Sequence, residues 1–160
     1  AALVLDPTFT QAALNLADLQ RSRGLEDEAE KTLREALKRD PRSAPAHLAL
    51  GLSLTRQKRT GEALKELAEA ARLAPENARF TYVYAVALND AGKAAQARRE
   101  LEGALKRQPY DREVLLALAL FERDAGDRAR AVGYARRLAE LEPDNAQLRQ
   151  LLQELGAAGR

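Results

Sequence analysis

The chain has 160 residues, of which 31% are charged and 46% hydrophobic, and its 26 lysines and arginines nearly balance 24 aspartates and glutamates, leaving a formal net charge of +2. This balance argues against a protein that binds nucleic acids through their phosphates. Cysteine is absent, which excludes disulfides, thiolate metal sites and cysteine nucleophiles. No apolar run approaches the roughly 18 to 20 residues of a membrane span. Methionine is also absent, so we expect these residues to be a fragment of a longer protein.

A period of 34 residues runs through the chain. It is kept by the prolines Pro7, Pro41, Pro75, Pro109 and Pro143. Two further columns have the same spacing, the alanines Ala29, Ala63, Ala97 and Ala131 and the small residues Ala17, Gly51, Ala85 and Ala119. A fixed period of this length indicates a solenoid, because such a unit buries its apolar face only by stacking on its neighbours.

Each unit is predicted to contain two helices. In the first unit apolar residues recur every three or four positions, at Leu14, Leu16 and Leu19 and again at Leu33, Ala36 and Leu37. A left-handed glycine is expected to end the first helix of three units, at Gly24, Gly92 and Gly126. Lys58 stands at this position in the second unit, before Thr60 and Gly61, so we expect a differently shaped turn there. The side chains expected to cap the first helices are Thr8, Ser43, Asn77, Asp111 and Asn145.

These columns resemble the tetratricopeptide repeat, a helix-turn-helix unit of the same length. The match puts Leu16, Leu50, Tyr84 and Leu118 at the apolar position before the small residue. The resemblance implies an all-α fold, a right-handed α-solenoid of tandem repeats with a C-terminal capping helix. It places one domain over 1–155: the end of a preceding repeat at 1–9, repeats at 10–43, 44–77, 78–111 and 112–145, the capping helix at 146–155, and a frayed tail at 156–160.

The sequence departs from the family where large or aromatic residues are usual, so we expect aliphatic cores. These positions hold Ala13, His47, Thr81 and Leu115 early in the first helices, and Gln20, Leu54, Leu88 and Glu122 near their ends. In the last helix, Leu148, Leu151, Leu152 and Leu155 occupy the apolar positions, and the side chains expected to face solvent are Gln147, Arg149, Gln150, Gln153 and Glu154.

No group of residues predicts catalysis or a cofactor. The single histidine, His47, follows Ser43 by four positions, but Ser43 is expected to cap a helix and His47 to fill a packing position. The acidic cluster of Glu26, Asp27, Glu28 and Glu30 lies at a helix start, where negative charge is favoured, and lacks the spacing of a calcium loop. Phosphate-binding and zinc motifs are absent as well. We therefore expect no enzyme activity, no cofactor and no metal.

The resemblance implies that the first helix of each repeat lines a concave groove with an apolar middle and a polar rim. The predicted partner-binding residues are Leu48, Leu52, Arg56, Arg79, Tyr82, Val86, Asn89, Leu116, Leu120 and Arg123. Family members that grip the carboxylate tail of heat-shock chaperones use a clamp of lysines, asparagines and an arginine. Here Asn15 matches one asparagine, but Leu14 and Asp18 replace its companions, so the clamp is absent.

The predicted function is a non-catalytic scaffold that holds a peptide or helical segment of a partner protein in this groove. The alternative is a module for self-association within a larger bacterial protein, so a homo-oligomer stays open. Neither nucleic acid nor a membrane span is expected. The composition resembles bacterial tetratricopeptide repeat proteins and, more weakly, repeats attached to multihaem cytochromes, which leaves periplasm and cytoplasm open.

Overall fold

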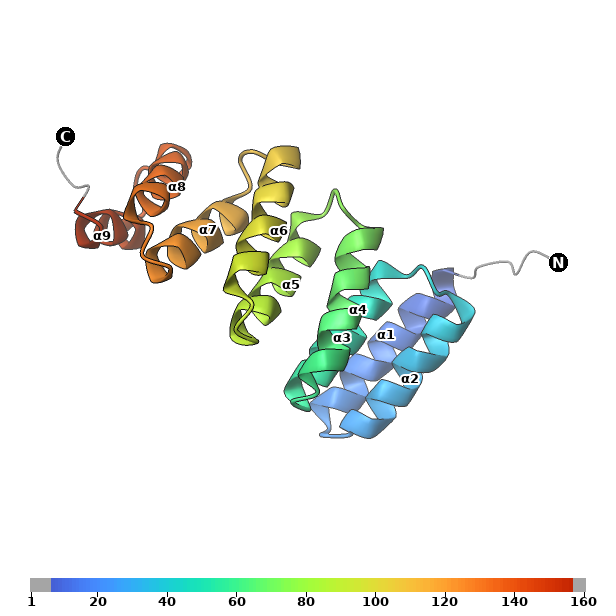
Figure 1. Ribbon diagram of the computed structural model, residues 1–160. Coiled ribbons are helices and arrows are strands. Elements are labelled where there is room, and N and C mark those ends of the chain that lie inside the picture. The colour runs from blue at the N-terminus through green and yellow to red at the C-terminus, as the bar shows by residue number, and fades with distance from the viewer. Residues whose placement is uncertain (1–6, 157–160) are drawn as a thin grey trace. The chain divides into compact units, whose positions relative to one another are not determined.

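The computed structural model describes residues 7–156, and every regular element among them is an α-helix. The helices are α1 (Pro7–Ser22), α2 (Glu26–Arg39), α3 (Ala44–Arg56), α4 (Thr60–Leu73), α5 (Ala78–Asp90), α6 (Ala94–Arg107), α7 (Arg112–Asp124), α8 (Arg128–Leu141) and α9 (Ala146–Glu154). None of these helices is long and apolar enough to cross a membrane. The chain divides into two compact units, Ala1–Pro75 (unit 1) and Glu76–Arg160 (unit 2), which contain α1 to α4 and α5 to α9 (Figure 1).

Side chains cap the helix starts at the positions that the 34-residue period predicts. Ser43, Asn77, Asp111 and Asn145 each accept a hydrogen bond from a free backbone amide in the first turn of the following helix. The cap predicted at Thr8 is wrong, because α1 already begins at Pro7. Proline lacks an N–H and its fixed φ suits the first turn of a helix, so α1 starts two residues earlier than a cap at Thr8 would place it.

The core of unit 1 lies where the two helix pairs pack on each other. Ala17, Ala29, Leu33, Leu50, Leu54 and Ala63 form one buried cluster drawn from α1, α2, α3 and α4. Leu50 and Leu54 are 1% and 0% exposed. Small residues at the helix crossings allow this close approach, as the alanine columns predict.

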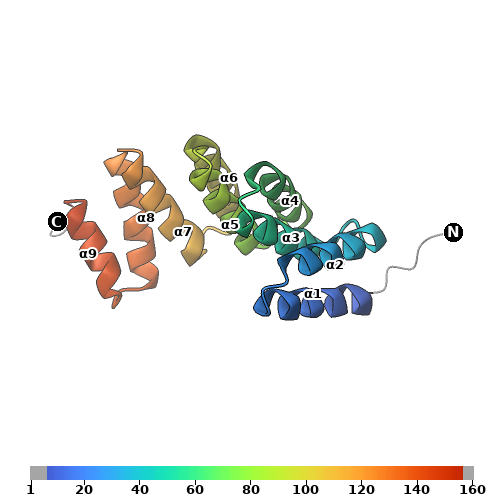
Figure 2. The same ribbon diagram turned by 90° about the horizontal axis from the view of Figure 1, so that it is seen from below.

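Unit 2 is built in the same way from α5 with α6 and α7 with α8, and α9 packs against α8 (Figure 2). Its buried residues repeat the columns of unit 1, with Ala85, Leu101, Leu118, Ala119 and Ala135 all fully buried. The core is largely aliphatic, although Phe80 and Tyr84 also contribute. Glu122 is an exception, since this charged side chain is only 2% exposed within it.

The turns between paired helices share one shape in all four pairs. Gly24, Gly92 and Gly126 have φ values of 77°, 76° and 84°, as predicted. Lys58 has a φ of 60°, and Arg59 donates to the Leu54 carbonyl just as Leu25 donates to Gln20. The prediction of a different turn at Lys58 is therefore wrong. The packing of α3 against α4 holds a lysine in the left-handed conformation that glycine adopts more readily.

Replacing Lys58 with glycine should stabilise unit 1, because the strain of a left-handed lysine is removed while the turn keeps its hydrogen bonds. We expect a gain of roughly 0.5–1 kcal/mol in the free energy of unfolding. Urea denaturation of Lys58→Gly beside the parent protein measures it. A loss of stability would mean that the added freedom of glycine in the unfolded chain outweighs the strain.

The outer face of α1 differs from the other first helices. Leu16 and Leu19 are both 47% exposed, whereas Leu50 and Leu118, which stand in the column of Leu16, are 1% and 0% exposed. The predicted end of a preceding repeat lies outside the described residues except for Pro7, Thr8 and Phe9, which belong to α1. The predicted tail also lies outside them, apart from Gly156.

Candidate functional site: two inter-helix grooves

A hollow of about 500 Å³ in unit 2 lies between α7 and α9, and we call it the α7–α9 groove. Its floor contains Leu138, Leu148 and Leu151, which are almost fully buried. Leu116, which is 41% exposed, and the half-buried Leu120 offer accessible apolar surface in it. Polar side chains that also line the groove are Arg112, Glu113, Arg123, Glu142, Asn145, Gln147, Gln150 and Glu154.

The charged residues around this groove are already paired. Arg123 lies 2.9 Å from Asp124, and Arg112 lies 3.5 Å from Glu142. Gln150 donates to Glu154 over 3.0 Å. These are exposed contacts of small individual value, so a ligand can exchange them at little cost.

A smaller hollow of about 270 Å³ in unit 1, the α1–α3 groove, occupies the equivalent place. Its position in the repeat is the same, because three periods separate Leu14 from Leu116 and Arg21 from Arg123. Leu52, at 37% exposure, provides its most accessible apolar surface. Asp18 and Arg21 form an ion pair of 3.1 Å at its edge.

Five of the ten predicted partner-binding residues line one of the two grooves, and the other five line neither. Leu116, Leu120 and Arg123 line the α7–α9 groove, and Leu52 and Arg56 line the α1–α3 groove. The residues that line neither hollow are Leu48, Arg79, Tyr82, Val86 and Asn89. Arg79 nevertheless reaches the first groove through its ion pair of 2.5 Å with Glu113, and its guanidinium lies 5.6 Å from the ring centre of Tyr82.

Sequence reasoning missed the contribution of α9. Gln147, Gln150 and Glu154 are exposed, as expected, and they also form one wall of the α7–α9 groove. The signal was present in the period, since Leu151 stands three repeats after Ala49 of the α1–α3 groove. A helix that caps an array therefore also completes its last groove.

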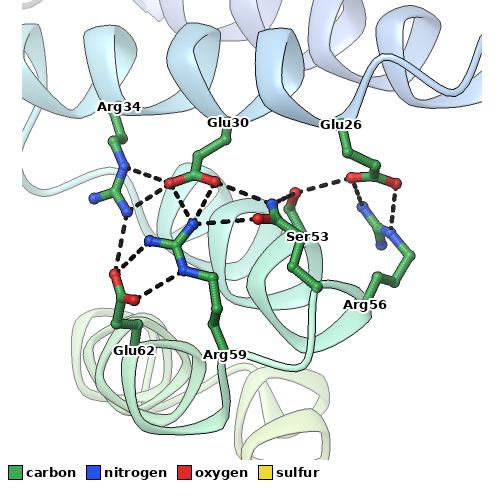
Figure 3. A network of polar contacts seen from close by, with 8 residues as sticks. Glu26, Glu30, Arg34, Ser53, Arg56, Arg59 and Glu62 are labelled. Carbon is green, nitrogen blue, oxygen red and sulfur yellow. Dashed lines mark hydrogen bonds and ion pairs between the residues drawn. The ribbon is translucent and has the colours of Figure 1, made fainter.

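A polar network in unit 1 fixes the arginine predicted at the groove rim (Figure 3). Arg56 donates to Glu26 over 3.0 Å, and Ser53 donates to the same carboxylate over 3.0 Å. Glu26 thus joins α2 to α3. The Arg56 side chain stays 42% exposed, so it borders the α1–α3 groove with a fixed guanidinium.

The second half of the network centres on Glu30, whose side chain is only 13% exposed. Arg34 and Arg59 each lie 2.7 Å from this carboxylate, and Gln57 donates to it over 3.0 Å. Arg59 and Arg34 also contact Glu62 of α4, at 2.7 and 3.4 Å (Figure 3). The acidic residues at the start of α2 therefore bind the next helix pair, rather than forming only a solvated face.

These contacts lower the pKa of the carboxylates involved. The hydrogen bond from Arg56 is the main cause for Glu26, whose pKa lies below the usual 4.5 despite partial burial. Burial alone would raise the pKa of Glu30, but the hydrogen bonds from Arg34, Gln57 and Arg59 outweigh it and lower the pKa. The charged forms are therefore the stabilised ones.

Acid should destabilise unit 1 by protonating this network. Because the pKa of Glu30 is lowered on folding, its contribution is fully present above the unfolded value of 4.5 and is lost as the pH falls through the lower folded value. We expect the urea midpoint to fall between about pH 5 and pH 2. The Glu30→Gln variant should start less stable and show a smaller fall. An equal fall in both proteins would assign the acid sensitivity to other carboxylates.

His47 lies on α3 and forms two polar contacts, one of them with α4. Its Nδ1 lies 2.6 Å from Glu66, and its Nε2 lies 3.1 Å from the carbonyl of Pro41. The Ser43 hydroxyl accepts the Ala46 amide as the helix cap. The described residues contain no group of three or more histidine or acidic side chains that could hold a metal ion.

Comparisons with known proteins agree with this architecture. Two tetratricopeptide repeat models match the chain, one over residues 1–44 and 14–78 and the other over 54–121. No curated protein matches the sequence.

Three solved structures illustrate the likeness. MamA protein has 19% identity and a TM-score of 0.76 over 93% of this chain and 84% of its own. PilF of Pseudomonas aeruginosa has 25% identity and a TM-score of 0.78 over 92% and 68%. YrrB, described as a TPR protein with an unusual peptide-binding site, has 19% identity and a TM-score of 0.69 over 91% and 77%. With its all-α helix pairs and its 34-residue period, the chain belongs to the tetratricopeptide repeat family.

Proposed function

We propose that this protein binds a peptide or helical segment of a partner protein, with the α7–α9 groove as its main site and the α1–α3 groove as a second one. Tetratricopeptide repeat proteins commonly serve as interaction scaffolds, and one structural neighbour, YrrB, has a peptide-binding site. The observation that carries the proposal is the pair of accessible leucines, Leu116 and Leu120, that line a hollow of about 500 Å³.

The groove chemistry favours a ligand with two apolar anchors and polar flanks. Leu116 and Leu120 lie one helical turn apart on α7, so they match anchors spaced three or four residues apart on a helix, or two apart on an extended segment. The rim offers both charge signs, through Arg112, Arg123 and Glu154. Arg79, Tyr82, Val86 and Asn89 on α5 are proposed to extend the site in unit 2, as Leu48 does in unit 1.

A random peptide library displayed on phage tests the proposal. We expect enriched peptides to carry paired apolar residues, and their affinity to fall about tenfold or more in Leu116→Glu or Leu120→Glu, because a buried leucine contact is replaced by a charge. Tyr110→Glu is the matched control, since Tyr110 is 75% exposed and lines neither groove. Thermal melting verifies that each variant folds. Library peptides that bind all variants equally would contradict the groove assignment.

The alternative, self-association through the same surface, is separated by sedimentation. It predicts that mass rises with protein concentration and that Leu52→Glu combined with Leu120→Glu yields a monomer. A binding scaffold instead predicts that both proteins sediment as the same species.

A further inference from the structure

The face that α1 and the start of α2 turn away from the rest of unit 1 is unusually apolar. We define the α1 face by Leu16, Leu19, Leu25 and Glu28. The three leucines are 47%, 47% and 43% exposed, which makes this the largest gathering of exposed leucines in the described part of the chain. A hollow of about 410 Å³ adjoins it, lined by Leu16, Phe9 and residues of α2 such as Thr32.

The chain itself shows what covers this face in its other repeats. One repeat after Leu16, Leu50 packs in a cluster with Ala29 and Leu33 of α2. Three repeats after it, Leu118 is fully buried on α7, which packs against α6. In both units the covering element is the second helix of the preceding repeat. In unit 1 its contact stripe combines alanine with leucine.

Polar contacts across these two interfaces add a rule about charge. In unit 1, Arg34 of the covering helix pairs with Glu62 over 3.4 Å. In unit 2 the equivalent residues, two repeats later, are Glu102 and Arg130, and they form an ion pair of reversed sign. The covering helix therefore supplies the charge opposite to the one it meets. Glu28 stands one repeat before Glu62, at the same position of the repeat as Glu62 and Arg130.

We infer that the α1 face binds an amphipathic α-helix that lays an alanine and leucine stripe over Leu16 and Leu19 and brings a lysine or arginine to Glu28. Two more positions define the ligand. Ser53 and Arg59 meet Glu26 and Glu30 of α2, but their equivalents on the α1 face are Leu19 and Leu25. The bound helix should therefore carry apolar residues where α2 carries these two glutamates. This surface is distinct from both grooves and does not depend on the proposed function.

The probe is a 14-residue peptide with the sequence of α2 in which Glu26→Leu and Glu30→Leu are introduced. Because an isolated helix of this length is marginal in water, a hydrocarbon staple replaces the side chains of Lys31 and Glu35, which are one turn apart. The peptide carries fluorescein, and its fluorescence polarisation is measured against the full chain. We expect saturable binding that weakens about tenfold or more in Leu16→Glu and is unchanged in Tyr110→Glu, a residue outside the α1 face and both grooves.

Charge exchange tests the register. The same peptide with Arg34→Glu should bind the parent protein about two- to fivefold more weakly, and Glu28→Arg in the protein should reverse this preference. The inference is overturned if no saturable binding occurs, if Leu16→Glu binds as well as the parent, or if Glu28→Arg leaves the preference unchanged. It is also overturned if the parent protein is a dimer that Leu16→Glu converts to a monomer, since a second copy would then cover the face. Loss of binding in Leu116→Glu alone would place the peptide in the α7–α9 groove.

Discussion

Replacing Gly51 with alanine is expected to destabilise the protein, although alanine is the better helix former. A β-carbon at this position would lie 2.6 Å from Cδ2 and 2.7 Å from Cγ of Leu67, and 3.2 Å from its backbone nitrogen. Leu67 is 1% exposed and cannot swing aside. Overpacking of this kind costs about 1–3 kcal/mol and alanine returns up to about 1 kcal/mol in helix propensity, so we expect a net loss of roughly 1–2 kcal/mol.

Gly133→Ala is the matched control for this prediction. Gly133 lies in the middle of α8, is exposed, and has nothing within 4 Å of an added β-carbon. It should gain up to about 1 kcal/mol from helix propensity alone. Urea denaturation of both variants measures the difference. If Gly51→Ala gained as much as Gly133→Ala, α3 and α4 could separate at no cost, and the close crossing would not constrain unit 1.

Removing the buried carboxylate of Glu122 is expected to destabilise unit 2. Its Oε1 lies 3.2 Å from Arg130 and its Oε2 lies 3.6 Å from Arg98, so the residue joins α7 to both α8 and α6. Glu122→Ala leaves a cavity and removes the carboxylate that Arg98 contacts, whereas Arg130 keeps its ion pair with Glu102. Because the arginine side chains are 24% and 46% exposed and retain water, we expect a loss of roughly 2–3 kcal/mol, below that for a fully buried pair.

Glu122→Leu separates packing from charge. Leu54 and Leu88 stand in the same column and are almost fully buried, so leucine suits this position in the repeat. The Oε1 atom also receives no well-aligned hydrogen bond, which makes the ionic contact imperfect. We therefore expect Glu122→Leu to remain within about 1 kcal/mol of the parent in thermal and urea unfolding. A loss as large as that of Glu122→Ala would show that the charge itself stabilises the packing of α6, α7 and α8.

Much of the local structure could be predicted because it depends on residues close together in the chain. The caps at Ser43, Asn77, Asp111 and Asn145 need only a short side-chain oxygen next to a free amide. The glycine turns likewise need only a residue that tolerates positive φ. Where local preference and packing disagreed, at Lys58, packing determined the conformation, and the sequence-based expectation was wrong.

The candidate site could be predicted only in part, since a groove depends on which side chains meet. The period placed Leu52, Leu116 and Leu120 at inward positions, and all three line hollows. It did not reveal that Arg56 is held by Glu26, or that α9 forms a wall with Gln150 and Glu154. Such contacts join residues that are far apart in the chain, such as Glu26 and Arg56, which are 30 positions apart. The pattern of one helix does not specify them.

The sequence by itself determined the family, the helix pairs and the positions of the small residues, because a 34-residue period and a short capping side chain act locally and repeat. Only the tertiary structure decided which charges are paired across helices, which glutamate is buried, and which leucines stay exposed. Leu16 and Leu50 stand in the same column and have the same local preferences. They differ in burial because exposure depends on the neighbouring helix: α2 covers Leu50, and no described helix covers Leu16.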